Sequence, residues 1–305
     1  QVWAVNTGGQ FSSPVVADGI VYVGTDTGQV QALAGGTGET VWRSDRLTIS
    51  NFVQPNVAGD TVLAAAGDSV FVLSAATGAV VEPGEISVDG DGLFVLSAVT
   101  RVADRVFFAT SRVDGSNGAV RAHTLETGER LWAAELDGGV QSSSPTVADG
   151  RVFVGTNAGD LHALEAETGA RAWRFETDDT VSSSPTVADG RVFVGSADSN
   201  LYALDAETGA QAWRFETGGA VDSSPTVAGG SVLVGSEDRS LYALDTTTGE
   251  QVWAFETDGS VSVSSPTVLE GTAFVGSADG GVYALDAGIN GSSQGSRVSL
   301  RTFGY

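Results

Sequence analysis

The stretch SSPTVADGRVFVGSADSNLYALDAETGAQAWRFETGG, residues 183–219, decides the fold, because close copies of it begin at residues 143 and 223. Pro145, Pro185, Pro225 and Pro266 are spaced by 40, 40 and 41 residues. A fixed period of about 40 residues is typical of solenoids and propellers. We count seven units, which begin near residues 10, 51, 97, 141, 181, 221 and 261.

Each unit contains four short runs of β-forming residues. In the quoted copy they are SSPTVAD, GRVFVGS, NLYALD and AQAWRFET, separated by residues that favour hairpin turns. The second and third runs are almost continuously apolar, as expected when both faces of a sheet are covered. Blade-on-blade packing covers both faces. The sequence therefore predicts an all-β fold, a seven-bladed β-propeller of four-stranded antiparallel blades.

The two ends of the chain predict how the ring closes. QVWAVNTGG at residues 1–9 matches QVWAFETDG at 251–259, and the seventh unit stops at Ala287 without a Trp. We expect residues 1–9 to form the outer strand of the last blade, with Trp3 as its missing Trp. Residues 1–287 then form a single propeller domain. Residues 288–305 form a Gly/Ser-rich tail that includes one candidate extra strand, SRVSLRTF.

A second motif links the third and fourth runs of each unit. Its pattern is A-x-D-x-x-T-G-x-x-x-W, as in Ala203, Asp205, Thr208, Gly209 and Trp213. Its glycines and tryptophans are Gly38, Gly128, Gly169, Gly209 and Gly249, and Trp3, Trp42, Trp132, Trp173, Trp213 and Trp253.

Each position of this motif has a physical reason. The Gly supplies a positive φ for a tight turn, and the Asp or Thr caps the turn amides. The Trp ring fills the gap between blades and its N–H finds a carbonyl. The Ala is small to leave room for the ring of the neighbouring blade. We interpret all these residues as structural, so the motif predicts fold rather than activity.

The motif closely resembles the tryptophan-docking motif of the pyrroloquinoline-quinone-like (PQQ-like) propeller repeats, over residues 1–287. This family contains quinone-dependent dehydrogenases and non-catalytic propellers, among them an outer-membrane assembly scaffold. The resemblance implies, for the dehydrogenases, a longer chain, a vicinal disulfide over the quinone, a Ca²⁺ and a catalytic Asp. The present chain has no Cys. We therefore predict a non-catalytic member without a quinone cofactor.

The charge of the chain is strongly negative. The formal net charge is −23, and all 15 basic residues are Arg. Dense carboxylates keep a protein hydrated where salt screens their repulsion, so we interpret the composition as adaptation to molar salt. The loss of Lys resembles proteins of haloarchaea; an ordinary acidic protein is the alternative. Binding to nucleic acid or to an anionic membrane surface is disfavoured because no basic cluster exists.

Two groups of carboxylates are candidate metal ligands. Asp89 and Asp91, in VDGDGLF, form a partial Ca²⁺-loop pattern that lacks a downstream bidentate acid, and ordinary turn chemistry is the alternative. The second group recurs in most blades, which favours a turn signature over a site. Its members are Asp26, Asp198, Asp238 and Asp279.

Other polar residues offer no catalytic constellation. His123 and His162 fall at strand positions, and the repeated serines Ser183, Ser184, Ser223 and Ser224 are interpreted as inner-strand residues without a convergent His. The loops that lead into the inner strands place polar residues at equivalent positions, which form either a ligand or peptide pocket at the channel mouth or a solvated rim. These residues are Gln10, Asn51, Gln141, Ser182, Asp222 and Ser262.

Blades two and three depart from the repeat. Residues 80–100 lack the Trp and the Ser-Ser-Pro, and residues 110–121 lengthen a hairpin by about four residues. Irregular loops on a rigid scaffold are where binding residues are usually found. We predict a protein-interaction scaffold whose partner is another protein. The alternatives are a subunit of a surface assembly that pairs or self-associates through the tail strand, and a quinone- or Ca²⁺-dependent enzyme.

The expected location is extracellular or at the cell surface of a halophilic archaeon. The chain opens at Gln1 without a basic or hydrophobic leader, so any export signal is expected to have been removed, and NGS at Asn290 is a glycosylation sequon.

Overall fold

The computed structural model describes residues 5, 12, 14–48, 53–88, 92–112, 114–116, 118–262, 264–289 and 292–293. Its contacts divide the chain into two compact units, which meet in sequence between Glu135 and Leu136. Each unit is described by itself. Over the described residues the regular structure consists of β-strands alone, without a helix.

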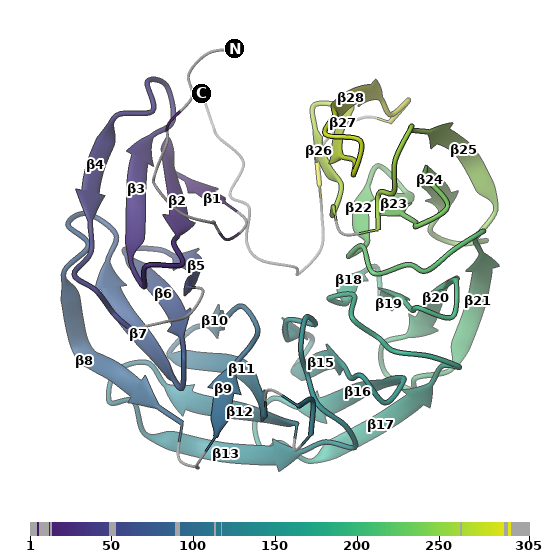
Figure 1. The fold of residues 1–305 in the computed structure, drawn as a ribbon. Coiled ribbons are helices and arrows are strands. Elements are labelled where there is room, and N and C mark those ends of the chain that lie inside the picture. The colour runs from purple at the N-terminus through teal and green to yellow at the C-terminus, as the bar shows by residue number, and fades with distance from the viewer. Residues whose placement is uncertain are drawn as a thin grey trace. The chain divides into compact units, whose positions relative to one another are not determined.

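The first unit contains three antiparallel sheets, blades one to three (Figure 1). Blade one consists of β1 (Val15–Ala17), β2 (Ile20–Gly24), β3 (Val30–Ala34) and β4 (Thr40–Arg43). Blade two consists of β5 (Val53–Ala58), β6 (Thr61–Ala66), β7 (Ser69–Ser74) and β8 (Val80–Ser87). Blade three consists of β9 (Leu93–Val95), β10 (Thr100–Val102), β11 (Arg105–Arg112), β12 (Ala119–Thr124) and β13 (Arg130–Glu135).

The second unit contains blades four to seven. Blade four consists of β14 (Thr146–Ala148), β15 (Arg151–Gly155), β16 (Asp160–Glu165) and β17 (Arg171–Glu176), and blade five of β18 (Thr186–Ala188), β19 (Arg191–Gly195), β20 (Asn200–Asp205) and β21 (Gln211–Glu216). Blade six consists of β22 (Thr226–Ala228), β23 (Ser231–Gly235), β24 (Ser240–Asp245) and β25 (Gln251–Glu256). Blade seven consists of β26 (Thr267–Leu269), β27 (Thr272–Gly276) and β28 (Val282–Asp286).

Two-residue turns join the first and second strands of a blade. Asp149-Gly150 and Asp189-Gly190 have φ values of 48° and 75°, and of 49° and 72°. Two successive positive φ values define the type I′ turn, whose twist matches that of the flanking strands. The Asp-Gly pairs in the sequence therefore fix tight hairpins.

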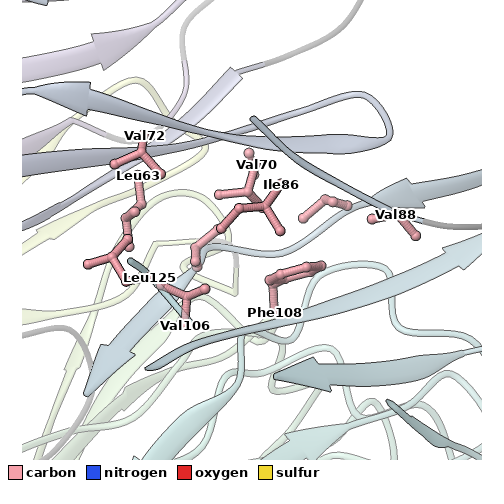
Figure 2. Packing of buried hydrophobic residues seen from close by; sticks show 11 residues of the cluster. Leu63, Val70, Val72, Ile86, Val88, Val106, Phe108 and Leu125 are labelled. Carbon is pink, nitrogen blue, oxygen red and sulfur yellow. The ribbon is translucent and has the colours of Figure 1, made fainter. Parts of the chain in front are cut away.

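The cores lie between neighbouring sheets. The middle strands are buried on both faces, as in RVFVG of β19 and LYAL of β20, whereas the outer strand β21 alternates between exposed and more buried residues. Figure 2 shows one such core in the first unit, where Ile86 of blade two and Val106 and Phe108 of blade three meet in one cluster. Both-face burial explains why these strands do not alternate apolar with polar residues.

The predicted all-β fold of seven antiparallel blades is confirmed. Blade seven has three strands within the described residues. Residues 1–4 and 6–11, with Trp3, lie outside the described part of the chain, so the ring closure stays a prediction. So does the assignment of residues 1–287 to a single domain.

Blade three differs from the regular blades in its inner edge. β9 and β10 both pair with β11, β9 opposite Thr110–Arg112 and β10 opposite Arg105–Phe107. β11 has eight residues where β15 has five. The longer hairpin expected from the sequence therefore adds a strand segment to this blade.

The start of the tail is held by blade seven. The Ser293 amide donates to the Val268 carbonyl at 2.9 Å, and the Val268 amide donates to the Ser293 hydroxyl at 2.8 Å. The stretch predicted as a Gly/Ser linker is thus bonded to β26 at this point.

Candidate functional site

Four of the docking tryptophans bind the following blade by hydrogen bonds. The indole Nε1–H of Trp173 donates to the Ala206 carbonyl at 3.2 Å, and that of Trp213 donates to the Thr246 carbonyl at 3.1 Å. Trp42 and Trp253 make the same bond to Ala75 and Ala287. The Trp N–H therefore finds the carbonyl acceptor that the sequence predicted. It belongs to the first residue of the Thr-Gly turn in the next blade.

In blades two, five and six the glycine of the Thr-Gly turn lies beneath that ring. Gly209 has a φ of 73°, as predicted, and a Cβ added to it would lie 2.7 Å from Cδ2 of Trp173. Gly249 would meet Trp213 at 2.6 Å. The sequence interpretation gave the task of making room for the neighbouring ring to the Ala. The structure places Ala203 opposite Trp213 of its own strand pair, and Gly leaves the space between blades.

The turn-capping role of the Asp is confirmed. Oδ1 of Asp205 accepts hydrogen bonds from the amides of Glu207 and Thr208 and from the Thr208 hydroxyl. These bonds stabilise the carboxylate and lower the pKa of Asp205, the Thr208 hydroxyl contributing most. The pKa of Asp245 is lowered chiefly by the amides of Thr248 and Thr247. These acids hold a turn rather than a ligand.

The repeated serines and threonines join one blade to the next, a role that the sequence interpretation missed. The Thr186 hydroxyl donates to the Pro225 carbonyl at 2.6 Å, and the Ser184 amide donates to the Ser224 hydroxyl at 2.9 Å. Ser183 accepts the Gly195 amide within its own blade at 3.1 Å. Ser183 and Ser184 precede the inner strand β18 rather than lie in it. The sequence did contain a signal for this role, because these polar side chains recur at a fixed place beside apolar strands.

Blade two keeps the turn glycine but not the Trp. Glu82 stands where the repeat has Trp, and the next blade is approached instead by Pro83 and Ile86. A Cβ added to Gly128 would lie 3.5 Å from Cβ of Pro83 and 3.5 Å from Cγ1 of Ile86, an ordinary contact distance. An apolar pair therefore replaces the indole at this junction.

Blade three retains one serine of the inner-strand motif. The Ser97 hydroxyl accepts the Ala109 amide at 3.0 Å, as Ser143 accepts the Gly155 amide at 2.8 Å in blade four. The longer hairpin ends in a turn in which the Arg112 amide donates to the Ser116 carbonyl at 2.9 Å, and the Ser116 hydroxyl donates to Asp114 at 2.7 Å. These bonds to Ser116 lower the pKa of Asp114.

The recurrent hairpin aspartates act as turn residues in blades five to seven, as expected. Asp198 accepts the Tyr202 hydroxyl at 2.7 Å and the Asp178 amide at 3.1 Å. Asp238 and Asp279 accept the hydroxyls of Tyr242 and Tyr283. The hydrogen-bonding capacity of these carboxylates is thus used within the fold.

The described channel-mouth candidates do not share one environment. Gln141 is exposed, Ser182 and Asp222 are half-buried, and Ser262 is buried. Burial raises the pKa of Asp222, with smaller contributions from Glu237 and Asp179. Their role in binding stays a prediction. Gln10, Asn51, Asp89, Asp91 and Asn290 lie outside the described residues.

Both histidines lie in strands, as expected. His123 in β12 contacts the Gly128 carbonyl through Nδ1 at 3.0 Å and stacks on Phe108, and His162 in β16 is buried. Among the described residues there is no group of three or more His, Asp or Glu side chains placed to hold a metal ion. The same residues contain no apolar helix of membrane-spanning length.

Comparison with known proteins places this architecture in a family. The family model described as outer membrane protein assembly factor BamB matches residues 1–115, 116–221 and 198–294. The chain belongs to this family. The resemblance to PQQ-like repeats is thereby confirmed.

Individual relatives cover part of the chain. It is 28% identical over 194 residues to outer membrane protein assembly factor BamB of Burkholderia pseudomallei, covering 57% of this chain and 45% of that protein. It is 31% identical over 185 residues to the dehydrogenase subunit of a quinone alcohol dehydrogenase of Acetobacter aceti, covering 55% of this chain and 20% of that protein. The chain therefore spans less than half the length of these curated relatives.

A solved structure confirms the fold. The crystal structure of BamB from Moraxella catarrhalis superposes with a TM-score of 0.73 at 20% identity, covering 92% of this chain and 87% of that one. At this identity the likeness supports a shared β-propeller fold.

Proposed function

We propose that this chain is a non-catalytic scaffold that binds another protein. The family match over nearly the whole chain carries the proposal, because the relatives that share it include proteins named as assembly factors. The structure adds support: the repeated Trp, Ser, Thr and Asp side chains of the regular blades are used in blade-to-blade and turn bonds. A rigid repeat with one irregular blade suits binding rather than chemistry.

The proposed docking region is the irregular part of blade three. β9 and the turn Arg112–Ser116 break the repeat there. The polar residues that lead into the inner strands of blades four to seven are a second candidate region.

The setting belongs to the same proposal. A net charge of −23 with Arg as the sole basic residue suits molar salt, and we place the chain at the surface of a halophilic archaeal cell or outside it.

The absence of Lys shapes the experiment that tests the scaffold role. Cross-linkers that target amines find no Lys in this chain, whereas 38 carboxylates are available. The chain is to be purified from its own source in molar salt, cross-linked with a dihydrazide reagent and analysed by mass spectrometry. We expect a discrete complex with one second protein, cross-linked through Asp114 of the blade-three turn.

A matched variant tests the location. Exchange of residues 113–118 for residues 156–159, the corresponding turn of blade four, is expected to abolish the complex while leaving the unfolding midpoint of the other blades unchanged. If this variant retains the complex, the docking region lies outside the blade-three turn. A chain that elutes alone contradicts the scaffold role itself.

The dehydrogenase alternative is the one favoured by the match to the quinone enzyme subunit. The described residues do not fit its site, because the chain has no Cys for the disulfide and no metal-binding group of acids comes together within the described ranges. Incubation with the quinone and Ca²⁺ is expected to produce no bound chromophore. Bound quinone absorbance after gel filtration would restore the enzyme. Weak Ca²⁺ binding at Asp89 and Asp91 predicts heat when the apo protein is titrated with Ca²⁺ alone in a calorimeter. The absence of heat, together with an unchanged melting temperature, rejects it.

The tail defines a third experiment. Removal of residues 294–305 is expected to dissolve any oligomer built by the tail strand. An oligomer that survives the deletion rules out this mode of self-association.

A further inference from the structure

Blade four breaks a polar pattern that blades five to seven share. In those blades a Tyr hydroxyl donates to the hairpin Asp four residues earlier, as Tyr202 does to Asp198 at 2.7 Å. Blade four has His162 at the Tyr position and Ala158 at the Asp position. An acid reappears two residues from the histidine, as Asp160. The same place in the fold is therefore occupied by a group that titrates near neutral pH.

His162 is sealed and lacks hydrogen bonds. Its side chain is 1% exposed, and neither ring nitrogen has a hydrogen-bond partner. The nearest acidic atom, Oδ2 of Asp160, lies 3.9 Å from Nε2 of His162 and is itself buried without a partner. A buried imidazole in this condition is adapted to its neutral form, because the charged form loses its hydration without replacement.

The charges around His162 act in opposite directions: Asp160 and Asp137 raise its pKa, whereas Arg174 and Arg171 lower it. Asp160 lies on the same strand, Arg171 and Arg174 lie on β17, and Asp137 lies in the segment before β14. The strand on the other side, β15, places the uncharged Val154 opposite His162.

Asp160 favours the protonated imidazole, but this carboxylate is already paired with another cation. Arg174 Nε donates to Oδ1 of Asp160 at 2.7 Å, and Arg174 also pairs with Glu176 at 2.9 Å. A protonated His162 would share this carboxylate with Arg174. Burial is accordingly the main cause that lowers the pKa of His162.

We propose that blade four is a proton-sensitive seam, in which proton uptake by His162 opens the pairing of β16 with β17. The pairing runs from Asp160 opposite Glu176 to Leu164 opposite Arg171, with His162 opposite Arg174 at its centre. The opened form exposes the imidazole to water and accepts a proton that the closed form resists.

The direction of the effect follows from linkage. An exposed His has a pKa of about 6.5, and the closed form has a lower one. The closed form is fully stable above about pH 6.5 and loses stability as the pH falls below it, until the pKa of the closed form is passed. One proton changes the opening equilibrium by at most about tenfold per pH unit within that window.

Hydrogen exchange of the full chain in molar salt tests the seam. We expect the amides of β16 and β17, corrected for intrinsic exchange, to lose protection between pH 7.5 and 5.5 relative to those of β20 and β21. Blade five is the internal reference, because Tyr202 stands there at the position of His162 and its hydroxyl donates to Asp198. Equal pH dependence in the two blades overturns the proposal.

Variants distinguish the effect of His162 protonation from the effect of low pH on the rest of the chain. The double variant A158D/H162Y, which restores the pattern of the other blades, is expected to remove the extra pH dependence. H162Q, neutral at every pH, must do the same even if it lowers stability overall. H123Q changes the other buried histidine and is expected to leave the pH response of blade four as in the parent chain. An NMR titration in which His162 protonates at or above pH 6.5 also overturns the proposal.

Discussion

At the scale of the residue, the contact of Trp with the turn glycine is the most sensitive to substitution. Gly209→Ala places a methyl group at 2.7 Å from the Trp173 ring and on a backbone with φ of 73°. We expect a loss of about 2–4 kcal/mol in the free energy of unfolding.

Gly128 provides the matched control. Its φ is 70°, but an added Cβ meets Pro83 and Ile86 at 3.5 Å. Gly128→Ala should therefore carry the backbone cost alone, about 1–2 kcal/mol. Urea unfolding of both variants measures the difference, and equal losses would refute the role of the indole contact.

The capping aspartates predict an acid response of their own. The lowered pKa values of Asp205 and Asp245 mean that their contribution is complete above the unfolded value of about 3.9 and is lost as the pH falls through the folded value. We expect the urea midpoint of the parent chain to exceed that of the Asp205→Asn/Asp245→Asn variant at pH 7. The gap should narrow at pH 3. A gap that is independent of pH contradicts the assignment.

The sequence was sufficient for these acids because a turn needs a side-chain acceptor at one fixed place. It was insufficient for the contact between the turn glycine and the Trp ring. A positive φ alone already explains a Gly at this position, so the sequence does not reveal that packing between blades requires it too. The Pro83 and Ile86 substitute was also hidden, because residues of a different shape fill the place of Trp42 and Trp213.

At the scale of the element, the inner strands are fastened by threonine. Thr186 is buried, and its hydroxyl donates to the Pro225 carbonyl in the next blade. Thr186→Val keeps the shape but leaves that carbonyl without its donor, at a cost of about 1–2 kcal/mol. Thr267 occupies the same repeat position in β26 and is exposed. Thr267→Val should change the thermal unfolding temperature little, and a similar loss in both variants would argue against the buried bond as the cause.

Blade seven carries the prediction about the N-terminal strand. Val282 of β28 is 80% exposed, whereas Leu241 at the same place in β24 is fully buried. A fourth strand would cover this face, and residues 1–9 have the matching sequence. We expect Trp3→Ala to lower the unfolding free energy by about 3 kcal/mol, comparable with Trp253→Ala. An unchanged midpoint for Trp3→Ala would reject residues 1–9 as that strand.

Strand order and hairpin turns were predictable because the four runs recur together from repeat to repeat and turn-forming residues separate them. The division of the inner edge of blade three into β9 and β10 was not. Its residues give no turn signal as strong as Asp189-Gly190, and Ser97 retains the serine role outside the Ser-Ser-Pro pattern.

At the scale of the whole molecule, the charge predicts dependence on salt. The Debye length falls from about 10 Å at 0.1 M salt to about 3 Å at 1 M, so repulsion among the carboxylates is screened. We expect the unfolding temperature to rise between 0.1 and 2 M KCl and to rise equally with NaCl. A chain that is most stable at low salt would contradict the halophilic setting.

The acidic composition favours a medium of high salt, and the repeat predicts the propeller fold. Neither identifies a binding partner. Binding surfaces arise where a blade departs from the repeat, as at the Arg112–Ser116 turn. Such a segment occurs once in the chain, so no second copy helps to interpret it. The pattern around His162 was visible as a substitution of Tyr. Its sealed environment depends on strand pairing, which a single sequence does not specify.

The bonds between blades also constrain the route of folding. Trp173 reaches a carbonyl 33 residues ahead, and Thr186 reaches one 39 residues ahead. Each of these junctions therefore closes a loop of about one repeat and does not wait for distant chain segments to meet, whereas the predicted pairing of residues 1–9 with blade seven does. Assembly can begin in any adjacent pair of blades and spread outward. Folding should therefore slow only modestly if a further blade is inserted, since only the loop between residues 1–9 and blade seven becomes longer, and closure cost grows slowly with loop length.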